Sequence, residues 1–367
     1  MSLPAAITRR ASETPVRAAD NLRPVAVWLL LCCAMIGVMV VLGGMTRLTL
    51  SGLSITEWQP VIGVLPPLSH AQWLIEFDKY KEIPQYRLVT HGMSLADFKT
   101  IYWWEYAHRL WGRLIGLAYA LPLLYFAVRR QLPRRLSASL AGILLLGAAQ
   151  GALGWYMVES GLAERVEVSQ YRLVAHLALA LAIYAATLWV ALGLLDEANP
   201  PHPDPPPQVG EGVSMCWRRA GEMLIGLVAL TILAGGFVAG LNAGLTYNTF
   251  PLMDGNLVPA GYAALEPLPR NWFENVAAVQ FDHRLLATVT LAAVLGLWLA
   301  GWRAALPPRT RIALRTLAGI AVLQFALGLG TLLLVVPIPL AAAHQAGAVL
   351  LLTAALVFRH CLRPAIA

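Results

Sequence analysis

The stretch Ala107-His108-Arg109-Leu110 returns later in the chain as Asp282-His283-Arg284-Leu285, and each copy lies just inside the start of a long apolar segment. Two further histidines hold similar places, in Val174-Ala175-His176-Leu177 and Ala342-Ala343-His344-Gln345. A single histidine in such a segment can be a proton relay or an interhelical hydrogen bond. Two pairs at matching positions instead indicate two metal centres, for which haem is the preferred group.

The composition is that of a membrane protein. Of 367 residues, 58% are hydrophobic and only 13% are charged, and the mean hydropathy is +0.63. Apolar runs of about 20 residues match the thickness of the hydrocarbon core of a bilayer. The sequence therefore predicts an all-α polytopic protein of the lipid bilayer, with eight transmembrane helices at roughly 25–45, 103–128, 137–157, 171–194, 219–240, 277–300, 312–335 and 340–359.

The positive charges predict how the chain is oriented. They gather in residues 1–24, in the loops after the second and sixth spans, and at the C-terminus, which is typical of cytoplasmic segments. We expect both termini in the cytoplasm of a bacterium with the protein in its inner (plasma) membrane, and the long loop 46–102 on the outward side. Residues 1–24 are interpreted as a cytoplasmic tail, because the first span is too long for a signal peptide. The net charge of +7 therefore does not indicate a nucleic-acid partner.

The two halves of the chain repeat each other in the same order. Besides the histidine segments, the matching stretches are Gly43-Gly44 with Gly235-Gly236, Ser51–Ser54 with Ala243–Thr246, and Gln150–Gly154 with Gln324–Gly328. With four spans each, both copies enter the membrane in the same direction. We expect two four-helix bundles related by a pseudo-twofold axis along the membrane normal.

The predicted organisation follows from this repeat. The N-terminal bundle covers 25–195 and the C-terminal bundle covers 219–360. A flexible Pro-rich cytoplasmic linker at 196–218 joins them, and 361–367 form a short cytoplasmic tail. Helix-compatible polar stretches are also expected within the long loop, around 69–82 and 93–100.

Each bundle is expected to hold one haem iron between two imidazoles. His108 pairs with His176, and His283 pairs with His344, all at about one depth on the outward side. Arginines near them can bind haem propionates with a bidentate fork, or can extend to the lipid headgroups instead; these are Arg47, Arg109, Arg113 and Arg284. Gln150 and Gln324 are expected to form interhelical hydrogen bonds.

The remaining histidines and the cysteines are not expected to carry chemistry. We interpret the other histidines, His70, His91, His202 and His360, as solvated. None of the cysteines, Cys32, Cys33, Cys216 and Cys361, lies in a predicted outward loop, so no disulfide is expected.

The halves differ at two positions of the repeat. Arg47 aligns with Ala239, and Glu57 aligns with Thr249. An electron carrier needs neither charge, whereas breaking a C–H bond requires a group that takes protons. Glu57 is therefore the candidate for acid–base catalysis, and the alternative is an ordinary glutamate at the membrane interface.

Two segments resemble the haem A synthase family. The first is Gly43-Gly44-Met45-Thr46-Arg47-Leu48-Thr49-Leu50-Ser51-Gly52-Leu53-Ser54, followed by Trp58-Gln59-Pro60, Gly63 and Pro66-Pro67. The second is Glu105-Tyr106-Ala107-His108-Arg109-Leu110-Trp111-Gly112-Arg113. The resemblance covers nearly the whole chain. Because the outward loops hold no cysteine pair, the chain looks more like the proteobacterial and mitochondrial branch.

The resemblance implies a function. Members oxidise the C8 methyl of haem O to a formyl group, giving haem A for cytochrome oxidase. By this analogy His108 and His176 bind the substrate haem, His283 and His344 hold a haem B cofactor with Arg284 nearby, and Glu57 is the important first-loop glutamate. Implied partners are haem O, an electron acceptor and, by association, haem O synthase and cytochrome oxidase assembly factors.

Two other functions were weighed against this one. A di-haem b-type electron-transfer protein typically carries two histidines on each ligand helix, whereas each helix here carries one. A transporter of parallel repeats would be expected to carry charged or broken helices at mid-membrane. The sequence favours a substrate haem beside a cofactor haem.

Overall fold

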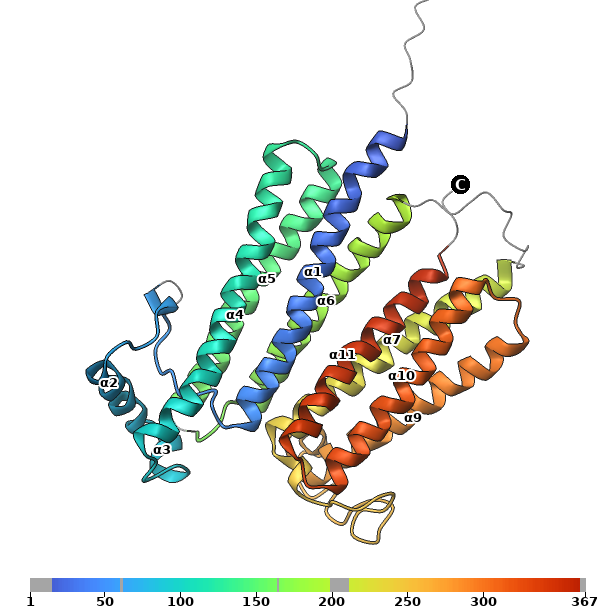
Figure 1. Ribbon diagram of the computed structural model, residues 1–367. Coiled ribbons are helices and arrows are strands. Elements are labelled where there is room, and N and C mark those ends of the chain that lie inside the picture. The colour runs from blue at the N-terminus through green and yellow to red at the C-terminus, as the bar shows by residue number, and fades with distance from the viewer. Residues whose placement is uncertain (1–14, 60–61, 164, 199–210, 364–367) are drawn as a thin grey trace, which may run out of the picture.

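The computed structural model describes residues 15–59, 62–163, 165–198 and 211–363 (Figure 1). Within these residues the chain is helical and contains no β-strand. Each of the eight longest helices includes an apolar window long enough to cross a membrane. They are α1 (Pro15–Leu48), α4 (Leu95–Val128), α5 (Arg134–Leu162), α6 (Gln170–Ala198), α7 (Glu211–Gly240), α9 (Val276–Arg303), α10 (Pro308–Leu333) and α11 (Ile338–Cys361). The predicted eight spans and the all-α class are confirmed.

The eight helices form two groups that lie side by side (Figure 1). The N-terminal group is α1, α4, α5 and α6, and the C-terminal group is α7, α9, α10 and α11. Contacts between the groups are made by α1 and α6 on one side and by α7 and α11 on the other. One hydrophobic core runs through both, with Leu29, Val228 and Phe358 almost fully buried. The pseudo-twofold relation between the groups stays a prediction.

The second glycine of each Gly-Gly pair lies where the two groups meet. A Cβ on Gly44 of α1 would overlap the side-chain amide of Gln345 on α11. A Cβ on Gly236 of α7 would lie 3.0 Å from Val174 and 3.2 Å from Leu177, both on α6. Small residues at these positions let the helix backbones approach closely, as in other membrane bundles.

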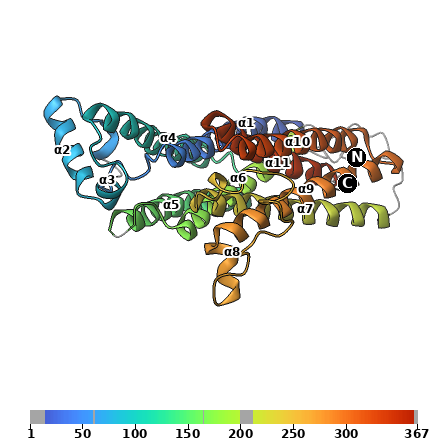
Figure 2. The same ribbon diagram turned by 90° about the horizontal axis from the view of Figure 1, so that it is seen from below.

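The long loop of the N-terminal group folds into two short helices, α2 (His70–Lys81) and α3 (Pro84–Leu88). Figure 2 shows both beyond one side of the bundle. Ser69 begins α2 with a capping box, as its position before an apolar-periodic stretch allows. The helix predicted around 69–82 is confirmed. The stretch predicted around 93–100 is not a separate element but the first turns of α4, which begins after the cap Ser94.

The prediction that His360 is solvated is wrong. Its side chain is 6% exposed, because it packs edge-on against Trp189 with ring centroids 5.3 Å apart and lies 3.5 Å from Asp196. His70 and His91 are exposed as expected, and His202 lies outside the described residues. Residues 196–198 and 211–218 of the predicted linker are helical, because α6 continues to Ala198 and α7 begins at Glu211, and the rest of it lies outside the described residues.

Candidate site with two histidine pairs

Each of the four histidine rings lies against a glycine of a neighbouring helix. A Cβ built on the glycine would stand 2.7–3.0 Å from a ring atom of His176, His283 or His344, so a side chain there would push these rings away, and 3.4 Å from His108, which is a close but ordinary contact. The four pairs are His108 of α4 on Gly43 of α1, His176 of α6 on Gly154 of α5, His283 of α9 on Gly235 of α7, and His344 of α11 on Gly328 of α10. All four glycines belong to the repeated stretches of the sequence. The repeat therefore marked them, but their contact with the histidine rings was not predicted.

The helices of the predicted histidine partners meet through shared neighbours. In the first group α1 packs against both α4 and α6, which carry His108 and His176, and in the second group α7 and α10 each pack against both α9 and α11, which carry His283 and His344. His176, His283 and His344 lie within the first eight residues of α6, α9 and α11, and His108 lies in the first half of α4. These helices begin at the end of the bundle that carries the long loops (Figure 1), so all four histidines are nearer that end, and the pairing of their rings stays a prediction.

The side chains of Gln150 and Gln324 form hydrogen bonds to the neighbouring helices that carry His176 and His344. The Gln150 amide nitrogen donates to the backbone carbonyl of His176 (3.0 Å) and lies 3.3 Å from its Nε2. The Gln324 amide donates to the carbonyl of His344 (3.0 Å). The predicted interhelical role of both glutamines is confirmed, and they fix the backbone at a histidine in each group.

The rings themselves are held differently in the two groups. His283 Nδ1 lies 3.1 Å from the carbonyl oxygen of Thr231, which fixes the proton on Nδ1 and leaves Nε2 as an electron-pair donor. The ring of His108, at the matching position, makes no hydrogen bond within the described part of the chain. The His176 and His344 Nδ1 atoms are buried without a partner among the described residues.

Arg109 binds the first loop. Its guanidinium donates to the carbonyls of Ile55 (2.7 Å) and Glu57 (2.8 Å) and pairs with Glu105 (2.6 Å). Glu105 is 2% exposed and also accepts from the Ser54 hydroxyl (2.8 Å) and the Ile55 amide (2.7 Å). This clamp closes the loop over the turn of α4 that carries His108.

The second group contains a clamp of the same shape. Arg284 donates to the carbonyls of Thr249 (2.7 Å) and Tyr247, which align with Glu57 and Ile55 of the first loop. The position of Glu105 is taken by Gln280, whose amide donates to the loop carbonyls of Ala243 (2.7 Å) and Thr246 (2.5 Å). An acceptor-only carboxylate in one half is thus replaced by a donating amide in the other.

Arg47 connects the two groups. Its guanidinium pairs with Glu167 of the loop after α5 (2.7 Å) and donates to the Ala239 carbonyl (3.1 Å) and to Asn242 (2.9 Å), both in the second group. A small cavity of about 60 Å³ extends from Arg47 and Glu167 to Gly43, on which His108 lies. Its lining is mainly apolar, but Arg47 and Glu167 offer polar partners to water, for which a cavity of this size has room.

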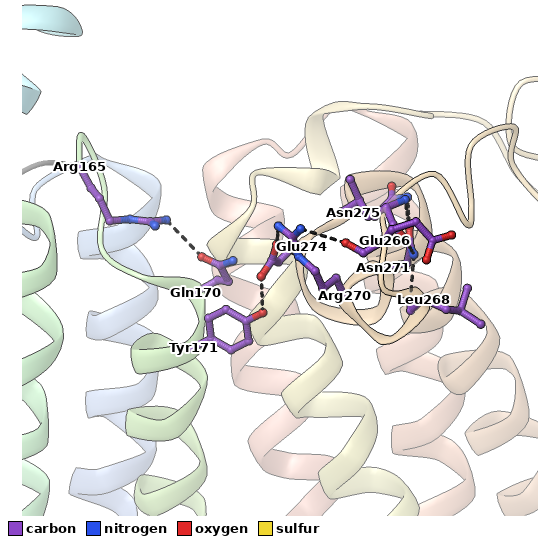
Figure 3. A network of polar contacts seen from close by, with 10 residues as sticks. Arg165, Gln170, Tyr171, Glu266, Leu268, Arg270, Asn271, Glu274 and Asn275 are labelled. Atoms are coloured by element: carbon purple, nitrogen blue, oxygen red, sulfur yellow. Dashed lines mark hydrogen bonds and ion pairs between the residues drawn. The ribbon is translucent and has the colours of Figure 1, made fainter.

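A second polar connection between the groups runs from the start of α6 to the segment before α9 (Figure 3). The Tyr171 hydroxyl of α6 donates to Glu274 (2.9 Å) of the short helix α8 (Asn271–Glu274). Glu274 also pairs with Arg270 (2.6 Å), and this pairing, followed by the bond from Tyr171, lowers the pKa of the Glu274 carboxyl.

Glu57 and Arg113 lie in or beside the first loop. The Glu57 side chain is 46% exposed and is held by Lys79 of α2 (3.0 Å) and the Gln59 amide (2.6 Å). The Glu57 and Glu76 carboxylates oppose the effect of partial burial and raise the pKa of Lys79, which keeps it charged. Arg113 donates to the Gln59 carbonyl (2.8 Å). Propionate contacts of these arginines stay predictions.

Comparison with known proteins gives the family. Residues 26–356 match the family described as cytochrome oxidase assembly protein (COX15-CtaA). The chain is 53% identical to "Heme A synthase" of Nitrosospira multiformis over 346 residues, covering 93% of this chain and 94% of that protein. It is 50% identical to "Heme A synthase" of Nitrosomonas eutropha over 355 residues, covering 97% and 96%. The chain belongs to the COX15-CtaA family.

Another relative is "Heme A synthase" of Rhodospirillum centenum, 53% identical over 351 residues, which cover 95% of this chain and 91% of that protein. The match of the COX15-CtaA family includes all four histidines, both glutamines and both clamps. The resemblance inferred from the two sequence motifs is confirmed. The clamp carboxylate Glu105 stood inside the quoted family motif, but its role depends on a loop about 50 residues earlier and appears only in the fold.

Proposed function

We propose that this chain is a haem A synthase, an oxidoreductase that converts the C8 methyl of haem O to a formyl group and so supplies haem A for cytochrome oxidase. Membership of the COX15-CtaA family and the three named relatives support this activity. The observation that carries it in the structure is the pair of imidazole sites at one end of the bundle, each ring on its own glycine.

Haem B is the proposed resident cofactor, held by His283 and His344. The residues fit such a group. Two neutral imidazoles on facing helices are a standard donor set for haem iron, and the Thr231 carbonyl directs the free electron pair of His283 to Nε2. Bound there, haem B would supply one-electron redox chemistry. Arg284 would stabilise the site through its loop clamp.

The substrate haem is assigned to His108 and His176. A cofactor has to stay bound, whereas a substrate has to enter and leave as product. The ring of His283 is fixed by a backbone carbonyl, and that of His108 makes no hydrogen bond within the described residues. The N-terminal group also carries the larger loop structure and the charged residues that the second half lacks, Arg47 and Glu57.

The reaction needs water, an outlet for protons and an electron acceptor. Conversion of a methyl to a formyl group consists of two two-electron oxidations, through an alcohol and a gem-diol that loses water. We propose stepwise removal of electrons and protons, with Glu57 accepting a proton or positioning water. Arg109 binds the Glu57 carbonyl and follows His108 directly, so it fixes the loop relative to the substrate site. The cavity at Arg47 and Glu167 offers water a place beside Gly43.

The test is expression together with a haem O synthase, followed by chromatography of the extracted haems and a reduced-minus-oxidised spectrum. Haem B together with haem O or haem A supports the proposal. Haem B alone supports the alternative, a di-haem b-type electron-transfer protein, and no haem contradicts both.

The proposed location is the bacterial inner membrane, with both termini in the cytoplasm and the histidine pairs toward the outward side. Cys216 provides a test, since it is exposed near the start of α7 and is predicted to face the cytoplasm. A membrane-impermeant thiol reagent should label it in inside-out vesicles and not in intact spheroplasts. Haem O synthase and cytochrome oxidase assembly factors are the proposed partners.

A further inference from the structure

A groove of about 440 Å³ lies between α10 and α11, toward the end of the bundle opposite the histidines. Its walls include Arg309, Ile312 and Thr316 of α10 and Leu350, Thr353 and Cys361 of α11. Ile312 is 63% exposed and Leu350 is 54% exposed, so the groove opens on the outside of the helix bundle, where lipid surrounds a membrane protein.

The walls of the groove offer little hydrogen bonding to a ligand. The Thr353 hydroxyl donates to the Val349 carbonyl (2.7 Å) and also contacts the Tyr184 hydroxyl (2.7 Å). Its other lining residues are mainly apolar. The part of a ligand that fills the groove must therefore be apolar itself.

The length of the groove matches one leaflet of a bilayer. Its lining runs from Arg309 to Ile320 on α10 and from Leu350 to Cys361 on α11, which is eleven residue steps on each helix (320 − 309 and 361 − 350). At ~1.5 Å per residue this is about 16 Å, close to half of a hydrocarbon core of ~30 Å. An acyl chain lying along the helices has this length.

One end of the groove is positively charged. Arg309 is the second residue of α10, and the first turn of that helix contains Arg311 and no acidic residue. Arg309 is exposed and has no hydrogen-bond or ion-pair partner among residues 15–59, 62–163, 165–198 and 211–363. Two carboxylates on neighbouring helices contact other residues: Asp196 lies 3.5 Å from the His360 ring, and Glu222 pairs with Arg359 (2.6 Å). The amino end of a helix adds to the attraction for an anion.

We infer that this groove binds an anionic phospholipid, with an acyl chain between α10 and α11 and the phosphate at Arg309. Basic sites between transmembrane helices at the headgroup level are suited to such lipids. The farnesyl tail of a haem is a poorer match, because it carries no charge for Arg309. Arg309 also lies at the end of the groove away from the histidines: His344 is six residues, or about 9 Å, from Leu350 at the near end, and seventeen residues, or about 25 Å, from Cys361 at the charged end.

Native mass spectrometry of the purified protein tests this inference. Phosphatidylglycerol and phosphatidylcholine with the same acyl chains are added in turn, and the retained lipid is measured. We expect roughly fivefold stronger retention of phosphatidylglycerol, the effect of one arginine near an anionic headgroup. Arg309→Gln should remove this preference. Thr316→Trp, which fills the groove from an exposed position, should reduce retention of both lipids.

Arg135→Gln is the matched control. Arg135 is the second residue of α5, as Arg309 is of α10, and it is also exposed. It should keep the preference for phosphatidylglycerol. Equal losses in the Arg135 and Arg309 variants would overturn the proposal, because they would indicate a general effect of surface charge. Unchanged retention in Thr316→Trp, or purification with a neutral lipid or a peptide in the groove, would overturn it as well.

Discussion

Replacing Glu105 by glutamine should loosen the first loop although the shape of the side chain is kept. The buried carboxylate accepts four hydrogen bonds, two from Arg109 and one each from Ser54 and Ile55. A glutamine has one oxygen, so it can serve one pair of donors while its amide group faces the other pair. Two bonds to a charged group are lost, each contributing about 1.5–3 kcal/mol. Breaking a buried ion pair from one side costs about 3–5 kcal/mol, in agreement with this sum.

Thermal unfolding in detergent measures this loss through the reaction of a thiol dye with Cys32 and Cys33. Both thiols are buried, 1% and 4% exposed, and react when the helices separate. Glu76→Gln removes a carboxylate from a more exposed pair with Lys79 and should change the unfolding midpoint little. Glu105→Gln should lower it clearly, reduce haem A formation and leave haem B in place.

A double substitution distinguishes the cost of leaving Arg109 without its carboxylate from the cost of losing the loop contacts. In Glu105→Gln with Arg109→Met, no uncompensated guanidinium remains, so the midpoint should recover part of the loss. If Glu105→Gln unfolds at the same temperature as Glu76→Gln, the buried carboxylate does not stabilise the loop.

Three further perturbations follow from the geometry. Gly328→Ala places a Cβ 2.7 Å from the ring of His344 and should lower the haem B content measured by spectroscopy, whereas Gly319→Ala on the same helix meets nothing within 4 Å and should leave it unchanged. Glu57→Ala should reduce haem A among the extracted haems and keep haem B; normal amounts of haem A would show that Glu57 is not catalytic. Arg270 is the main cause that lowers the pKa of Glu274 in the folded protein from its usual 4.5. The contribution of this pair to the free energy of unfolding is therefore complete above pH 4.5 and is lost as the pH falls through the folded-state pKa. Glu274→Gln should therefore remove the part of the acid sensitivity of unfolding below about pH 4.5 that comes from this pair, and an unchanged pH profile would contradict that assignment.

The sequence predicted the eight spans to within a few residues at most ends, because long apolar runs are decisive in a bilayer. The helical stretch around 93–100 was predicted apart from the second span, although it is the first turns of α4, since Leu95–Tyr102 carry polar residues and project beyond the apolar run. The histidine partners were predicted from the repeat alone, and their pairing stays a prediction. The glycines that contact the histidine rings lay in the quoted repeats, but the role of a glycine depends on which helix packs against it.

Long-range polar contacts were beyond sequence reasoning. The partners of Glu105 lie about 50 residues earlier, and those of Arg47 lie up to 195 residues later, in the other half of the chain. His360 was predicted to be solvated because it stands at the end of the last span. It is buried because Trp189 of α6 packs against its ring, a contact that depends on how the two groups meet.

The two histidine pairs are proposed to hold different haems. This assignment can be tested by extracting the haems from His108→Ala and from His283→Ala, each expressed with a haem O synthase. We expect His283→Ala to lose haem B, and His108→Ala to keep haem B but to contain neither haem O nor haem A. Loss of haem B from the His108 variant with retention in the His283 variant, or the same haem content in both, would contradict it.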